Sequence, residues 1–268
     1  MGGGVKGTVA RFSLNRREKI TNRAIEQTGK DLGIFLKKHT KTNIVVVNER
    51  TWKNLGHGKH AAAFYKESED TLYIRRKYFA KRGLEVEIHE RLHARSGNHV
   101  YRSPVSQMLE EGTVDWLTDY TKKNSFRTKG TKFGRETGTG YITETSFVTN
   151  IMTIIGREKY LGYWQRGMLN KTGGEINVHN IQKDLKDAGY WKTANNVGKY
   201  WDKGLQDRSF QTHKINKDLN DEIKERKGKN WSLTQHVDII TYEKKVRSQF
   251  TAKARKEDEK YRKSHLFL

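Results

Sequence analysis

The stretch EVEIHERLHARSG, Glu85 to Gly97, places two histidines four residues apart within a helical pattern. Leu84, Ile88 and Leu92 recur at i, i+4 and i+8, which is the spacing of one apolar face of a helix. Arginines occupy the final turns and a glycine follows them, as is common where a helix ends. The stretch therefore predicts an amphipathic helix that carries both histidines.

On such a helix, His89 and His93 lie on one face about one turn apart. That spacing lets two imidazole nitrogens bind one zinc ion, while Glu90 can approach a zinc-bound water. The chain has no cysteine, so any metal must be held by histidine and carboxylate. The alternative is a solvated charged helix that contains histidine without binding metal.

A third ligand is what separates a metal site from a coincidence, and the next predicted helix, QMLEEGTVDWLTDY (107–120), offers one. Glu111 shares a polar helical face with Asp115, whereas Glu110 points the same way as Val114, a core candidate. We therefore expect Glu111, rather than Glu110, to complete the site.

Two further residues of this helix fit the same interpretation. Asp115 is placed to accept a hydrogen bond from the far ring nitrogen of a ligand histidine, which would fix its tautomer. The alternative for Asp115 is an exposed helix carboxylate. Gly112 has no side chain, which suits close packing of a neighbouring helix around a metal, and its cost of about 1 kcal/mol relative to alanine suggests a reason for its presence.

The rest of the first half predicts a small sheet between helices. A first amphipathic helix covers 16–39, and NIVVVNE (43–49) is a β-branched run. Residues 61–76 form a strand, a polar turn at 67–70 and a second strand. Ser103 and Pro104 suit the N-cap and first position of the second helix. The predicted class is α+β, with a sheet of a few strands, an active-site helix and a glutamate-bearing second helix.

The second half is helical and more polar. Residues 142–169 have a helical pattern with a break near Gly156, and the chain beyond about 170 is rich in lysine. We expect one domain at 1–170 and a basic, mainly helical extension at 171–268.

The segments HERLH (89–93) and EEGTVD (110–115) resemble the gluzincin branch of zinc metallopeptidases. In that family an active-site helix carries His-Glu-x-x-His and a following helix supplies a glutamate ligand. The preceding TLYIRR (71–76) resembles the strand that borders the active-site cleft and pairs with substrate backbone. The sequence departs from the family in its Leu-Glu-Glu lead-in, where Asn-Glu or Trp-x-x-Glu is usual.

The resemblance implies that His89, His93 and Glu111 bind zinc and that Glu90 is the general base. Asp115 takes the position of a carboxylate that supports a ligand histidine in some members. The implied activity is hydrolysis of a peptide or protein substrate by a zinc-bound water, with the oxyanion stabilised by zinc and a hydrogen-bond donor. The sequence leaves that donor open among His99, Tyr101, Tyr120, Tyr141 and His179.

The charge of the chain favours polyanionic partners. Its 268 residues contain 53 Lys and Arg against 31 Asp and Glu, a net charge of +22. The alternative function is a basic scaffold or nucleic-acid-binding protein that has a zincin fold and no proteolytic role, with Trp191 or Trp201 stacking on bases. Small basic chains without cysteine also resemble phage-encoded proteins, and such a scaffold would be packaged in a virus particle. The simplest alternative is a basic surface that only confers solubility.

The sequence has neither a signal peptide nor a run of about 18 apolar residues, the length that a membrane helix needs. We expect a soluble protein with no membrane partner, located in the cytoplasm or within a virus particle.

Overall fold

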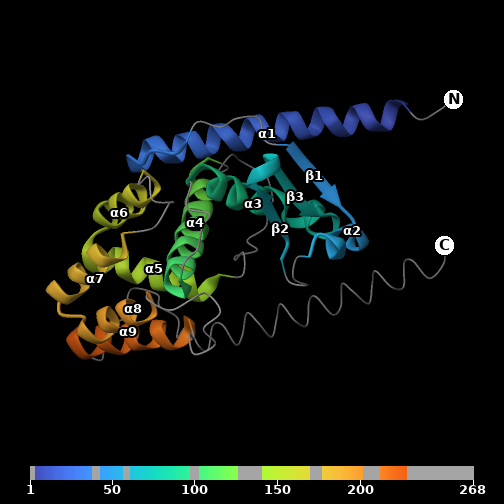
Figure 1. Cartoon of the computed structure of the whole chain (residues 1–268). Coiled ribbons are helices and arrows are strands. Elements are labelled where there is room, and N and C mark those ends of the chain that lie inside the picture. The colour runs from blue at the N-terminus through green and yellow to red at the C-terminus, as the bar shows by residue number, and fades with distance from the viewer. Residues whose placement is uncertain are drawn as a thin grey trace. The chain divides into compact units, whose positions relative to one another are not determined.

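The computed structural model describes residues 4–37, 43–56, 61–96, 103–125, 141–169, 177–201 and 212–227. The chain divides into two compact units, Met1–Leu219 and Asn220–Leu268. The first unit contains the sheet and helices α1 to α8 (Figure 1), and it holds every candidate site residue that the structure describes. Helix α9, Thr212–Lys227, spans the division between the units.

The sheet has the strand order β1-β3-β2. Strand β3 (Thr71–Arg75) runs parallel to β1 (Asn43–Val47) and antiparallel to β2 (Ala63–Lys66), with a 3-10 turn over Glu67–Glu69. The predicted strands and polar turn are confirmed. The expectation that residues 71–76 pair with substrate backbone is wrong, because β3 is paired on both sides. In the described part of the chain, β1 and β2 are the two edge strands of this sheet.

The side chains of the sheet alternate between two packed faces. Leu72 and Ile74 are fully buried on the face that packs with Val86 of the next helix, α3. On the opposite face, Phe64 stacks on Tyr73, and Trp52 of helix α2 (Glu49–Asn54) contacts Phe64 edge-on. The sheet thereby fixes the position at which α3 begins.

Helix α3 (Arg76–Ser96) follows β3 without a connecting loop, and α4 (Pro104–Ser125) packs against it. Figure 1 shows α3 between the sheet and α4. The apolar stripe is confirmed, since Ile88 and Leu92 are fully buried. The predicted cap is also confirmed, because the Oγ atom of Ser103 accepts a hydrogen bond of 3.1 Å from the backbone N–H of Ser106.

Helix α1 (Gly4–Leu32) contacts α3 through ion pairs. Arg91 lies 3.6 Å from Glu18, and Arg95 donates a hydrogen bond of 3.1 Å to Glu26. Arg91 and Arg95 alternate along α3 with the two histidines, so they lie on nearly the opposite side of the helix. One side of α3 is therefore tied to α1 and the other is left for the histidines.

Helices α5 (Ile142–Ile155) and α6 (Arg157–Leu169) are separated at Gly156, which has a φ of 92°. The predicted helical break is thus confirmed. Left-handed backbone of this kind favours glycine because it has no Cβ.

Helices α7 (Val178–Asp187) and α8 (Trp191–Trp201) belong to the same compact unit as the sheet. Asp184 connects α7 to α6, since it accepts hydrogen bonds from Lys159 at 2.7 Å and Tyr163 at 2.6 Å. The expected domain boundary near residue 170 falls in 170–176, outside the described residues.

The described chain is mostly helical with one small mixed sheet. At that level the predicted α+β class is confirmed. Among the described helices, none combines the length and the apolar character that crossing a bilayer requires.

Candidate metal centre

Three buried side chains from two helices converge on one point. The Nε2 atoms of His89 and His93 lie 3.1 Å apart, and each is 3.3 Å from Oε2 of Glu111. Tetrahedral zinc ligands at bond lengths of about 2.0–2.1 Å lie roughly 3.3 Å from one another. The three atoms are therefore spaced as ligands of a single ion, and the group could hold a metal.

The far nitrogens of the two rings each face a carboxylate. Nδ1 of His89 lies 3.7 Å from Oδ1 of Asp115, and Nδ1 of His93 lies 3.3 Å from Oε1 of Glu110. A carboxylate that accepts a hydrogen bond from Nδ1 holds the proton there and leaves the Nε2 lone pair for a metal. The donor set and its support both suit a metal ion.

Glu110 is the residue whose role the sequence did not reveal. Its position beside Val114 predicted a core side chain, and it is indeed only 1% exposed. Its carboxylate accepts hydrogen bonds from Oγ of Ser96 at 2.9 Å and from Nε1 of Trp164 at 2.6 Å, in addition to facing His93. The one signal in the sequence was a negatively charged residue at a predicted core position, because a buried carboxylate needs hydrogen-bond partners.

Asp115 is fixed by helix α5, which approaches α4 closely at Gly112. Thr145 donates a hydrogen bond of 2.8 Å to Asp115. A Cβ atom on Gly112 would lie 2.4 Å from the carbonyl oxygen of Glu144 and 2.8 Å from Val148. The expected close packing at Gly112 is confirmed, and it brings Thr145 to Asp115.

The same approach brings Tyr141, which directly precedes α5, to the cluster. Its ring is nearly parallel to that of His89, with 5.6 Å between centroids and 3° between planes. Burial raises the pKa of Tyr141, and the nearby Glu111 raises it further, so the hydroxyl remains protonated at neutral pH. Of the other expected donors, His99 and Tyr101 lie outside the described residues, Tyr120 stacks on Trp116, and His179 contacts Trp201.

The ionisable groups of this cluster shift one another's pKa values. Burial alone would lower the pKa of His89, but Asp115 and Glu111 outweigh burial and raise it to about 9. The same competition raises the pKa of His93 well above its ordinary value, chiefly through Glu111. Burial would raise the pKa of Glu111, yet the two imidazoles hold it well below its usual range. In the metal-free protein, positive charge on the imidazoles is therefore favoured by the surrounding carboxylates.

Glu90 lies beside this cluster without belonging to the triangle of ligand atoms. Burial raises the pKa of its carboxyl, while His89 and His93 oppose that change. The backbone N–H of Tyr65 in β2 donates a hydrogen bond to Glu90. The backbone N–H of Arg75 donates a hydrogen bond of 3.0 Å to the carbonyl of Ala62, so residues 62, 64 and 66 direct their main-chain groups toward β3. Tyr65 therefore directs its main-chain groups to the outer edge of β2.

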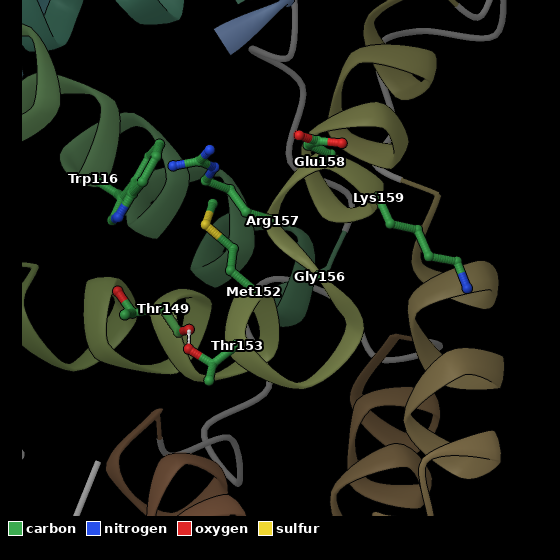
Figure 2. A pocket seen from close by; sticks show the side chains of 8 residues that line it. All are labelled: Trp116, Thr149, Met152, Thr153, Gly156, Arg157, Glu158 and Lys159. Atoms are coloured by element: carbon green, nitrogen blue, oxygen red, sulfur yellow. Dashed lines mark hydrogen bonds between the residues drawn. The ribbon is translucent and has the colours of Figure 1, made fainter. Parts of the chain in front are cut away.

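A hollow of about 590 Å³ lies elsewhere, where α4, α5 and the start of α6 meet. Figure 2 shows the guanidinium of Arg157 pointing toward Trp116, beside Met152, while Lys159 points away. None of the metal-site residues lines this hollow, although Trp116 follows Asp115 in the chain.

No protein-family model matches the chain, and neither a curated protein nor a solved structure is similar to it. The function is therefore inferred from the chain's own residues and their geometry.

Proposed function

We propose that this protein is a zinc-dependent peptidase of gluzincin type. The observation that carries the proposal is the triangle formed by His89, His93 and Glu111, with Glu90 beside it but outside the ligand set. A structural metal site has no use for a base next to its ligands, whereas hydrolysis requires one.

Zinc bound to the three residues would polarise a substrate carbonyl and lower the pKa of a water molecule towards about 7. Glu90 would accept the proton at its carboxylate. Burial raises the pKa of this carboxyl, which brings it closer to the working pH of a general base. The hydrogen bond from Tyr65 fixes the carboxylate at the edge of the sheet.

Tyr141 is our candidate for the donor that stabilises the oxyanion. Its raised pKa keeps a proton on the hydroxyl, and its stacking on His89 holds the ring beside the metal ligands. His179 and Tyr120 are engaged with tryptophans on other parts of α4, α7 and α8.

A peptide substrate would pair with the outer edge of β2. Extended peptides bind exposed strand edges through main-chain hydrogen bonds. Ala63 directs its main chain to the same side as Tyr65, whose N–H already donates to Glu90. A strand bound at this edge would lie next to Glu90 and the metal ligands.

The test combines metal analysis of the purified protein with cleavage of a diverse peptide library. We expect about one zinc per chain and cleavage that Glu90→Gln abolishes while metal content and melting temperature stay unchanged. Cleavage that is equal in wild type and Glu90→Gln would refute the peptidase. A zinc-loaded wild type that cleaves nothing would instead favour the alternative, a basic scaffold or nucleic-acid-binding protein.

A further inference from the structure

Helix α8 presents an exposed stripe of aromatic, amide and basic side chains. Trp191, Asn195 and Lys199 recur at i, i+4 and i+8, so they lie on one side of the helix, and all three are exposed. Thr193, Ala194 and Val197 form the opposite, buried face. The stripe is therefore the outward face of a helix that is anchored by its other side.

Trp191 is the most exposed large hydrophobic side chain of the described residues, at 59%. An indole usually buries most of its surface, and Trp164 and Trp52 do so completely in this protein. The position of Trp191 at the first turn of α8 leaves its ring face available to a planar partner.

The surroundings of Trp191 are positively charged. Helix α8 contains Lys192 and Lys199 and no acidic residue. The neighbouring carboxylate, Asp218 of α9, is mostly buried and engaged by Lys192 at 2.8 Å and by Asn196 at 2.9 Å. These bonds join the first half of α9 to α8 and neutralise Asp218.

The start of α9 adds further cations to the same compact unit. His213, Lys214 and Lys217 are exposed on the turns that precede and flank Asp218. Because Asp218 binds Lys192, α9 lies on the side of α8 that carries Lys192, and Lys214 lies one turn before Asp218. The two helices together combine one exposed indole with several lysines.

We infer that the α8–α9 surface, defined by Trp191, Asn195, Lys199, Lys214 and Lys217, binds single-stranded nucleic acid. Lysines would contact phosphates, and the indole would stack on an unpaired base. A duplex offers no unstacked base, so the exposed indole favours a single strand. This surface is separate from the metal centre and does not depend on peptidase activity.

The experiment uses the full-length protein and fluorescence anisotropy with a labelled oligothymidylate, over a series of salt concentrations. Trp191→Ala should weaken binding by about 10-fold, and Trp191→Phe should restore most of the affinity because the phenyl ring also stacks. Lys199→Ala with Lys214→Ala should reduce the slope of log affinity against log salt by about 0.7 for each phosphate that a lysine no longer neutralises.

Lys183→Ala is the matched control, because this exposed lysine of α7 is paired with Asp187 and lies outside the surface. It should leave affinity and slope unchanged, as should Glu90→Gln. The inference is overturned if Trp191→Ala binds as wild type, or if Lys183→Ala weakens binding as much as Lys199→Ala does. It is also overturned if a duplex of the same length binds as tightly as the single strand, or if no oligonucleotide binds at low salt.

Discussion

Trp164 and Glu110 are joined by a hydrogen bond of 2.6 Å from the indole Nε1 to a carboxylate oxygen. The other oxygen of Glu110 lies 3.3 Å from Nδ1 of His93. A residue of α6 is thereby connected to a candidate metal ligand on α3 through one carboxylate on α4. The support of the site extends well beyond the two helices that supply its ligands.

This connection predicts how Glu110 and Glu111 differ. Glu111→Ala removes a ligand atom and should abolish tight zinc binding, whereas Glu110→Gln keeps an acceptor for His93 but loses the charge and should weaken zinc by about 10-fold. Titration with a competing chromophoric chelator measures both variants. Glu158→Gln, at an exposed position on α6, is the control. An equal or larger effect of Glu110→Gln would mean that Glu111 is not the third ligand.

The approach of α5 to α4 predicts a strong effect of one methyl group. Gly112→Ala places a Cβ against the backbone of Glu144, so α5 must move away and Thr145 must leave Asp115. We expect a decrease of about 1–3 kcal/mol in the free energy of unfolding and weaker zinc binding. The measurement is denaturant unfolding with and without metal.

Gly162 supplies the control for that substitution, since a Cβ there meets nothing within 4 Å. Gly162→Ala should be neutral or stabilising by up to about 1 kcal/mol, as alanine is the better helix former. Similar destabilisation in the two variants would show that the packing at Gly112 is not specific.

Zinc binding should release protons. The pKa of His89 is about 9 in the metal-free protein and that of His93 is also raised, so protons compete with zinc for the imidazoles at pH 7. Zinc should therefore displace protons, and its apparent affinity should increase with pH until about pH 9. Calorimetry in buffers of different ionisation enthalpy counts these protons. Release of none would show that the imidazoles are already neutral.

The same shift predicts a pH effect on the stability of the metal-free protein. A pKa that folding raises from about 6.5 to about 9 stabilises the folded state fully below pH 6.5, and this contribution disappears as the pH increases through 9. Protein treated with a chelator should therefore melt at a lower temperature at pH 9 than at pH 6.5. His89→Gln should reduce this difference. A wild-type melting temperature that does not change would contradict the prediction.

Substitution of either Tyr141 or Glu90 should slow peptide cleavage if the protein is a peptidase. Tyr141→Phe keeps the ring stacked on His89 and removes only the hydroxyl, so kcat should fall by about 10²-fold with zinc content unchanged. Glu90→Gln should cost at least about 100-fold for a different reason, the loss of the base. Tyr120→Phe, whose ring stacks on Trp116, is the control. Full activity of Tyr141→Phe would exclude it as the oxyanion donor.

Local patterns predicted most of the elements around the site. The strands near 43–47 and 63–75, the helix of the two histidines and the break at Gly156 all follow from short-range periodicity and glycine or proline placement. The preference for Glu111 over Glu110 as the residue that meets the Nε2 atoms of the histidines also followed from helical phase. Each of these features depends on residues a few positions apart in the chain, so a single sequence is enough to reveal it.

Contacts between residues that are distant in the chain could not be predicted from the sequence in the same way. Nothing in the spacing of the chain indicates that Trp164 reaches Glu110 or that Thr145 reaches Asp115, because each pair is fixed by helix packing. The position of β3 in the middle of the sheet likewise depends on β1, which is parallel to it and distant in the chain. Tyr141 was one of five possible donors in the sequence, and its stacking on His89 depends on the approach of α5 at Gly112.

The alternation of histidines and arginines along α3 has a consequence for changes in chain length. A substitution can remove His93 or Arg95 and leave the other in place. A single-residue insertion between His89 and His93 would instead rotate everything after it by about 100° around the helix axis. His93 would leave the ligand cluster and Arg95 would leave Glu26 of α1 together. This segment should therefore accept point changes independently at its two faces and accept no insertion or deletion.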